Sequence, residues 1–306
     1  MRILSFQPTS TEMAYALGAG RAIVGVSHEC TYPPAAKRKP VVSTSVIDPD
    51  RMSGEEIDRA VVAAAREGRS LYTVNRELVL RLKPDVLLTQ SLCDVCATSP
   101  SDLREVLQIV KPKPRVLSLH AHDFEGMFAD LRELADFLGK DARPLEKKLR
   151  ARVAAVLRKT RRLPKRRVFC MEWVDPVYAS GHWVPEMVEM AGGVDPLGVQ
   201  GKDSRRIEWA EVVAAAPEVL ILMPCGYSRE QTLRELPKAV SRPGWSELPA
   251  VRAGEVWHAD GPAYFNGGGT RLVDGLEILA EILHPDRFPR RHRSGYARIL
   301  AASKDP

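Results

Sequence analysis

Three cysteines follow two apolar runs that resemble each other. Cys93 and Cys96 come directly after the strand-like run 84–89, and Cys225 follows the matching run 217–222. Ligands of open parallel α/β sheets bind at the carboxyl ends of the strands, so these thiols point to a site there. A Cys-x-x-Cys pair can hold a metal as thiolates, work as a redox dithiol or fill a buried space, and all three interpretations remain open.

The chain has five cysteines, an odd number that argues against a framework of disulfides and for reduced thiols. Cys30 lies in another loop, whereas Cys170 lies inside an apolar run and is expected in the core. One hypothesis is that Cys30, Cys93, Cys96 and Cys225 hold zinc or an iron–sulfur cluster for redox or enzymatic work. His28 or His182 would then complete the ligand set, although either can equally be a solvated loop histidine.

Aromatic and polar side chains gather in the loops that are expected to follow the strands. A large flat apolar ligand would explain them there, because tyrosine and tryptophan are otherwise costly to expose. The candidate ligand-binding residues are Thr11, His28, Cys30, Tyr32, Cys93, Cys96, Trp173, His182, Trp183, Cys225, Tyr264, Phe265 and Arg271.

Strand-like and helix-like segments alternate along both halves, which predicts α/β architecture with mostly parallel sheets. An amphipathic helix is expected over 123–138, with Asp123 as N-cap and Gly139 as its stop. A second helix follows, from Pro144 to about Pro164, with a core face that includes Leu157; it is long enough to connect two lobes. We therefore expect an N-terminal lobe at 1–122, connecting helices at 123–164, a C-terminal lobe at 165–288 and a polar tail at 289–306.

The two halves share a short pattern. Glu12-Met13 precedes Gly18, and Glu186-Met187 precedes Gly192 at the same spacing. Such degenerate repetition indicates a duplicated pair of similar lobes facing each other across a ligand cleft. Chance reuse of helix and turn residues is the alternative.

Charge and motifs exclude several functions. Residues 143–167 contain 12 Lys and Arg against the single Glu146, but no nucleic-acid-binding motif accompanies them, so we expect a solvated helix face and no nucleic-acid partner. No apolar segment is long enough for membrane insertion.

Motifs of common enzyme classes are missing. The nucleophile elbow, the phosphate-binding loop and the zincin motif are absent, and Gly267-Gly268-Gly269 is too short for a dinucleotide fingerprint, so we expect no enzyme. The start of the chain has no signal-peptide pattern, which predicts a cytoplasmic protein, or a periplasmic one if a leader is missing.

Five segments together resemble the cobalamin-binding relatives of the vitamin B12 and iron-siderophore substrate-binding proteins of ABC importers. The resemblance covers about residues 2–288. The segments are Pro8-Thr9-Ser10-Thr11-Glu12, Gly25-Val26-Ser27 leading to Tyr32-Pro33-Pro34, Leu82-Lys83-Pro84-Asp85-Val86, Glu172-Trp173 with Ala191-Gly192-Gly193, and Arg271-Leu272-Val273-Asp274-Gly275-Leu276.

The resemblance implies two Rossmann-like α/β lobes joined by a long helix, as in class III periplasmic binding proteins, with a corrinoid or other metal chelate in the cleft between them. Aromatic side chains that flank the corrin ring would here be Tyr32, Trp173, Trp183, Tyr264 and Phe265. It also implies that carboxylates on the lobe surfaces, here Glu77 and Glu208, dock the transporter. The expected function is corrinoid binding, with an ABC importer or a corrinoid-handling enzyme as partner.

Overall fold

The computed structural model describes residues 1–90 and 106–299, so Cys93 and Cys96 lie outside the described residues. The chain divides into two compact units. Unit 1 comprises Met1–Met52 and Glu56–Lys148, and unit 2 comprises Ser53–Glu55 and Leu149–Pro306. Unit 1 thus includes the helix expected over 123–138 and the first residues of the next helix.

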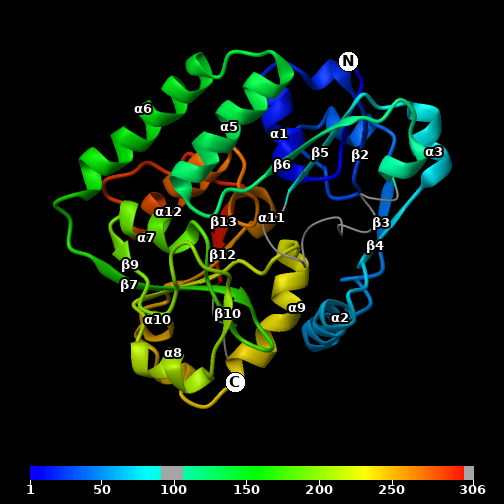
Figure 1. The fold of residues 1–306 in the computed structure, drawn as a ribbon. Coiled ribbons are helices and arrows are strands. Elements are labelled where there is room, and N and C mark those ends of the chain that lie inside the picture. Colours follow the sequence, from blue (N-terminus) through cyan, green and yellow to red (C-terminus); the bar gives the residue numbers. More distant parts are fainter. Residues whose placement is uncertain (91–105, 300–306) are drawn as a thin grey trace. The chain divides into compact units, whose positions relative to one another are not determined.

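A parallel four-stranded sheet forms the centre of unit 1 (Figure 1). Its order is β2 (Ile23–Val26), β1 (Ile3–Ser5), β5 (Val86–Gln90) and β6 (Arg115–Leu119). A separate antiparallel pair joins β3 (Ser43–Ser45) to β4 (Tyr72–Val74). Just before β3, Val41 makes an isolated parallel bridge to Val26.

The helices of unit 1 are α1 (Pro8–Ala16), α2 (Gly54–Glu67), α3 (Arg76–Leu82) and α5 (Phe124–Leu138), with the short 3₁₀ turns η1 (Gly20–Ala22) and η2 (Ala36–Arg38). Of these helices, α1, α3 and α5 contact strands of the sheet. Val79 of α3 packs with Leu4 and Leu87 on one face, while α1 and α5 contact each other and the sheet. The Asp123 Oδ1 atom accepts a hydrogen bond from the Gly126 N–H at 2.6 Å, and Gly139 ends α5 with a φ of 64°, which confirms both predicted caps.

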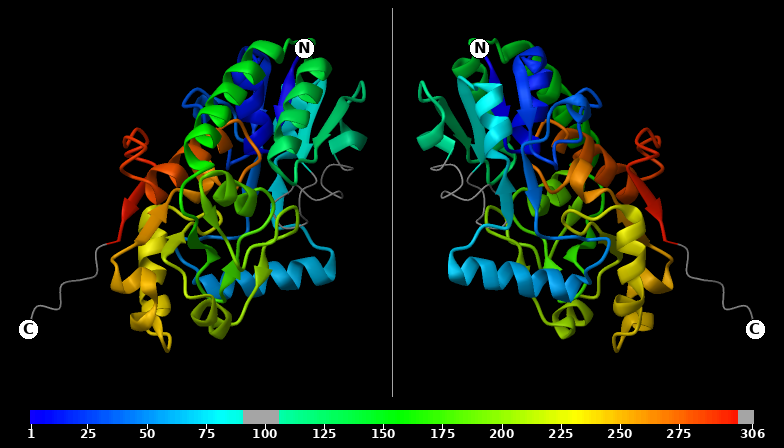
Figure 2. Two further views of the ribbon diagram at one scale, coloured as in Figure 1. Left: turned by 90° about the vertical axis from the view of Figure 1, so that its left-hand side faces the viewer. Right: turned by 90° about the vertical axis from the view of Figure 1, so that its right-hand side faces the viewer.

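Unit 2 is built on a seven-stranded mixed sheet. The strands are β7 (Arg166–Trp173), β8 (Tyr178–Ala179), β9 (Gly193–Val194), β10 (Arg205–Arg206), β11 (Val219–Leu222), β12 (Val256–Ala259) and β13 (Tyr296–Arg298). The central strands β7, β11 and β12 are parallel. β13 pairs antiparallel with β12, beside which it lies in Figure 2, so the predicted polar tail contributes a strand.

The helices of unit 2 pack on the two faces of its sheet. They are α6 (Arg143–Thr160, from Leu149 onward), α7 (Val184–Met190), α8 (Trp209–Ala215), α9 (Arg229–Val240), η3 (Trp245–Glu247), α10 (Pro249–Arg252), α11 (Gly261–Tyr264) and α12 (Leu272–Leu283). One cluster joins Phe169 of β7 to Val212 of α8 and Ala239 of α9. On the opposite face, Gly193 lies against Val168, Val188 of α7 and Leu283 of α12. Among the described residues, no helix is long and apolar enough to cross a membrane.

The repeated Glu-Met pattern marks the same local structure in each unit. α1 and α7 both begin with a proline in their first turn; α1 follows the first strand of unit 1, and α7 follows the short second strand of unit 2, β8. Gly18 and Gly192 then turn the chain with φ angles of 76° and 86°. Positive φ favours glycine because it has no Cβ.

Candidate functional site

The predicted site residues are divided between the two units, and they lie at the ends of strands or in the loops and helices that follow them. Unit 1 contains Thr11, His28, Cys30 and Tyr32, and unit 2 contains Trp173, His182, Trp183, Cys225, Tyr264, Phe265 and Arg271. Cys93 and Cys96 are outside the described residues. We describe the two groups separately, because each is positioned by its own sheet.

In unit 1, Cys30 belongs to a buried cluster of hydroxyl groups. The Thr11 Oγ1 atom donates to the Ser5 Oγ atom at 2.8 Å and to the Cys30 Sγ atom at 3.1 Å, and the Ser27 Oγ atom lies 3.1 Å from the same sulfur. Cys30 is only 3% exposed, and burial raises the pKa of its thiol. A neutral, hydrogen-bonded thiol ties the loop after β2 to the start of α1.

His28 and Tyr32 lie in the same loop but nearer to the surface. The His28 Nδ1 atom is 3.3 Å from the Ser43 Oγ atom, and its ring centroid is 5.6 Å from that of Tyr72. Burial lowers the pKa of His28, so its imidazole is neutral at physiological pH. Tyr32 is 42% exposed and precedes a cis proline, Pro33. It offers a large ring surface at a strand end.

In unit 2, the end of β7 carries an aromatic pair. The rings of Trp173 and Tyr227 are 4.7 Å apart between centroids, and the Trp173 Nε1–H donates to the Gly54 carbonyl at 3.1 Å. Tyr227 is buried, and desolvation raises its pKa to about 12. Trp173 is only partly buried, so this pair forms a fixed apolar surface with one accessible indole.

A carboxyl group that the sequence analysis did not select lies next to this pair. Desolvation raises the pKa of Glu172 to about 7, although hydrogen bonds from the Ser204 hydroxyl and the Gly181 N–H oppose the shift. Asp195 adds a nearby negative charge, and its own pKa is raised by burial. Asp195 accepts hydrogen bonds from the Ser180 hydroxyl at 2.7 Å and the Gly198 N–H at 2.9 Å.

Trp183 and Phe265 occupy internal positions in unit 2. They are 1% and 2% exposed, and the Trp183 Nε1–H donates to the Phe265 carbonyl at 2.7 Å. This bond ties the start of α7 to the segment after α11, so both residues position loops in this structure rather than offering a ring face. The preceding His182 has a φ of 50° and its Nε2 atom lies 3.1 Å from an Asp203 carboxylate oxygen.

The remaining candidates of unit 2 lie after β11 and around α12. The Cys225 N–H donates to the Glu172 carbonyl at 3.1 Å, and its side chain is partly buried. The Arg271 guanidinium lies 5.8 Å from the centre of the Tyr264 ring, a cation–π contact just before α12. Both Tyr264 and Arg271 are partly buried.

The described residues give no support to the cysteine-ligated metal centre. Cys30 is a protonated thiol inside unit 1, whereas metal binding requires a thiolate. Of the described residues, only Asp274, Glu277 and His292 form a group able to offer three metal ligands, and it contains no cysteine. The Arg152 guanidinium already pairs with both carboxylates, at 2.8 Å from a Glu277 oxygen, so this group is an ion-pair network.

Comparison with known proteins identifies the fold and gives several named relatives. A family model described as periplasmic binding protein matches residues 3–263. An uncharacterized ABC transporter substrate-binding lipoprotein of Bacillus subtilis is 25% identical over 94% of this chain and 81% of the relative. A vitamin B12-binding protein of Vibrio cholerae is 23% identical over 92% of this chain and 88% of the relative.

Solved structures agree with this fold. A periplasmic heme-binding protein from Pseudomonas aeruginosa has a TM-score of 0.69 at 20% identity and covers 94% of this chain and 93% of its own. The periplasmic vitamin B12-binding protein of Vibrio cholerae has a TM-score of 0.64 at 21% identity, covering 92% and 96%. These likenesses confirm the predicted class of fold, two α/β units with a long helix, α6, shared by both.

Proposed function

The chain belongs to the periplasmic binding protein family, whose model matches most of its length, and on this premise we propose that it binds a corrinoid or a similar metal chelate. Membership makes it a binding protein rather than an enzyme. The observation that carries the choice of ligand is the sequence similarity to vitamin B12-binding proteins along nearly the whole chain. A zinc or iron–sulfur role is not favoured.

The accessible aromatic groups support this ligand class. Tyr32 in unit 1, and Trp173 and Tyr264 in unit 2, all lie at the carboxyl ends of strands with part of their rings exposed. A corrin or porphyrin presents a broad apolar face, and covering it with aromatic rings yields a hydrophobic gain of roughly 25 cal/mol per Å² buried. Tyrosine hydroxyls can also hydrogen-bond to peripheral amides or carboxylates.

The test is a titration with two chelates. Cyanocobalamin and hemin would be added separately to the purified protein, with binding followed by calorimetry and by the visible spectrum of each chelate. We expect cyanocobalamin to saturate one site, and Tyr32→Ala or Trp173→Ala to weaken it roughly tenfold each. Leu80→Ala, an exposed apolar residue on α3, is the control that leaves binding unchanged. If hemin binds saturably and cyanocobalamin does not bind, the ligand is a porphyrin rather than a corrinoid. If neither chelate binds, the proposal is overturned.

We further propose a cytoplasmic location, in which the bound chelate is handed to another protein. Its support is the set of free thiols among the described residues, Cys30, Cys170 and Cys225, which suits a reducing compartment. Fractionation of cells tests this proposal directly. Recovery with periplasmic or surface proteins would contradict it and favour delivery to an ABC importer.

If the chain serves an importer, the exposed Glu77 on α3 and Glu208 before α8 are the proposed docking carboxylates, one in each unit. Glu77→Gln is the cleaner test, since the Glu208 side chain belongs to a capping box of α8. We expect it to reduce uptake driven by this protein while ligand affinity in solution stays unchanged. Unchanged uptake would remove Glu77 from the docking surface.

A further inference from the structure

The end of α6 and the segment leading into β7 carry an uninterrupted set of positive charges. Residues 158–167 contain seven Lys and Arg and no acidic residue. Arg166 and Arg167 are used inside unit 2, where they hydrogen-bond to backbone carbonyls of residues 216, 218 and 283. The other basic residues lie at the surface and are not explained by chelate binding.

Three of these surface residues have no countercharge. Arg158, Arg161 and Arg162 are exposed and make no ion pair with any residue that the structure describes. Lys159 lies 4.9 Å above the Phe288 ring, and Lys165 pairs with Glu189 at 2.8 Å. Three positive charges that lie close together without a countercharge repel one another and attract anions. This surface therefore favours an anionic partner.

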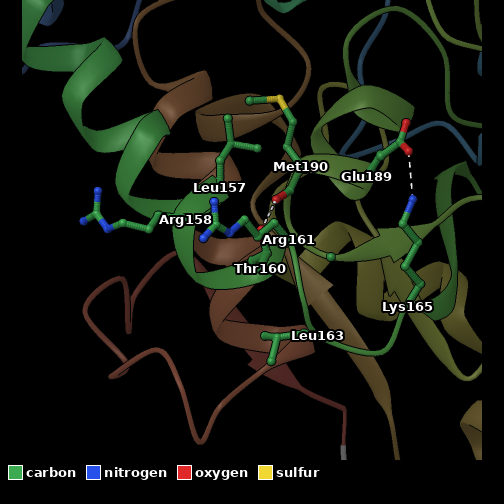
Figure 3. Close-up of a pocket in the computed structure, with 9 residues that line it drawn as sticks. Leu157, Arg158, Thr160, Arg161, Leu163, Lys165, Glu189 and Met190 are labelled. Atoms are coloured by element: carbon green, nitrogen blue, oxygen red, sulfur yellow. Dashed lines mark hydrogen bonds and ion pairs between the residues drawn. The ribbon is translucent and has the colours of Figure 1, made fainter.

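The same surface is hollowed and has apolar patches. Figure 3 shows Arg158 on the last turn of α6, Arg161 just after it, and Lys165, which also lines a groove of about 420 Å³. Leu157, Leu163 and Met190 contribute apolar lining, and Leu157 is 40% exposed although the sequence predicts it on the core face of α6. A second groove, of about 530 Å³, shares Arg158, Arg161 and Leu163 with the first and is also lined by Asp286 and Arg287.

We propose that this basic surface, defined by Leu157, Arg158, Arg161, Arg162 and Leu163, binds the surface of a membrane that contains anionic phospholipids. Guanidinium groups recognise phosphate, and an exposed leucine beside them can enter the boundary between head groups and acyl chains. Nucleic acid fits less well, because none of the described residues that line the two grooves is aromatic and could stack on a base. This inference is independent of the ligand proposed above.

The experiment is sedimentation of the full chain with large vesicles. Vesicles of phosphatidylcholine alone are compared with vesicles that also contain phosphatidylglycerol, at about 0.1 M and about 1 M salt, where the Debye length falls from roughly 10 to 3 Å. We expect binding only to the anionic vesicles and only at low salt. Each basic residue near such a surface contributes roughly fivefold, so the triple variant R158Q/R161Q/R162Q should bind roughly a hundredfold more weakly.

A matched control removes the same charge elsewhere. K37Q/K111Q/K113Q neutralises three exposed lysines of unit 1 and should lose far less than the Arg triple variant. Circular dichroism and thermal unfolding check that all variants are folded. Equal loss in both triple variants, equal binding to both vesicle types, or no binding to the anionic vesicles would overturn the proposal. So would displacement by duplex DNA or by millimolar inorganic phosphate at constant ionic strength, which would indicate a nucleic-acid or free-anion site.

Discussion

At the scale of single residues, Glu172 makes the end of β7 sensitive to pH. It directly precedes Trp173, its backbone carbonyl accepts the Cys225 N–H, and its carboxyl accepts the Ser204 hydroxyl. Because desolvation raises its pKa to about 7, small changes around neutral pH alter its charge. The charge of this buried carboxyl, which contacts Ser204 and Gly181, therefore changes around neutral pH.

Replacing this carboxyl should flatten the dependence of stability on pH. The folded pKa of Glu172, about 7, lies above its ordinary value of 4.5, so folding favours the protonated form. The wild type therefore loses stability relative to Glu172→Gln as pH rises from about 4.5 to 7, and the difference levels off above 7. Urea denaturation of both proteins across this range measures it. Glu230→Gln, an exposed carboxyl on α9, should follow the wild type, and parallel curves for wild type and Glu172→Gln would contradict the prediction.

The sequence predicts some residues of the candidate site and misses others. Tyr32 and Trp173 were selected because aromatic residues after strands are unusual, and both keep accessible rings in the structure. Glu172 was not selected, because a glutamate beside a tryptophan reads like any exposed residue. Its raised pKa comes from burial in the folded protein, with an added contribution from the negative charge of Asp195, and neither can be read from the adjacent residues. Trp183, like Trp173, is a tryptophan expected in a loop after a strand, but its side chain is buried. Only the tertiary structure shows which of the two indoles is accessible.

At the scale of elements, the paired turns after α1 and α7 have the same backbone conformation and different surroundings. Gly18 and Gly192 both have positive φ. A Cβ added at Gly18 would meet nothing within 4 Å, whereas one at Gly192 would lie 2.5 Å from the His284 Nε2 atom. The first turn requires glycine for its conformation alone, and the second also requires it for space.

Alanine substitutions should separate these two requirements. Gly18→Ala should lower the free energy of unfolding by about 1–2 kcal/mol, the usual cost of a left-handed residue with a Cβ. Gly192→Ala should cost more because of the contact with His284, and the added cost should shrink in the double variant Gly192→Ala/His284→Ala, relative to His284→Ala alone. Chemical denaturation measures all four variants. Equal costs at the two glycines would show that the His284 side chain moves aside freely.

The junction between α6 and α12 depends on one arginine. Arg152 on α6 donates from Nε to a Glu277 oxygen at 3.0 Å and also pairs with Asp274, while the His292 Nε2 atom lies 2.7 Å from Glu277. Burial tends to raise the pKa of Glu277, but hydrogen bonds from His292 and Arg152 outweigh it and lower the pKa to about 2. The carboxylate therefore stays charged at any pH at which the protein is handled.

Removing this guanidinium should destabilise unit 2. Arg152→Met leaves two partly buried carboxylates without their main partner, and we expect a loss of about 1–3 kcal/mol in the free energy of unfolding. Arg158→Met, on the same helix but without an ion pair, is the matched control and should change stability by less than about 0.5 kcal/mol. Urea denaturation compares them. Restoration of stability by adding Asp274→Asn and Glu277→Gln to Arg152→Met would confirm that uncompensated charge is the cause.

Sequence periodicity predicted most of the longer elements because their signals are local. The caps of α5 agree with the prediction, since Asp123 and Gly139 act within one turn of the helix. β13 was missed because three residues in a polar tail become a strand only through pairing with β12. The spacing of its apolar residues places Leu157 on a core face of α6, but in the structure Leu157 is 40% exposed, whereas Val156 and Thr160 of the same helix are buried.

At the scale of the whole molecule, the two units have separate sheets and separate aromatic candidates, Tyr32 in unit 1 and Trp173 in unit 2. A chelate bound by both units must stabilise both against unfolding, because binding to the native state adds RT ln(1 + [L]/Kd). A chelate bound by one unit would stabilise only that unit. Calorimetric unfolding with and without ligand therefore reports on how many units take part.

We expect cyanocobalamin at about 100 times its Kd to raise the free energy of unfolding by about 2.7 kcal/mol and to shift the unfolding of both units together. At the same ligand concentration, Tyr32→Ala and Trp173→Ala should each reduce this gain by roughly 1.4 kcal/mol, the equivalent of a tenfold weaker Kd, although the two residues lie on different sheets. Leu80→Ala again serves as the unaffected control. If only the Trp173 variant lost the gain, and the unfolding of unit 1 were the same with and without ligand, binding would belong to unit 2 alone. The aromatic ring of Tyr32 would then have no part in holding the ligand.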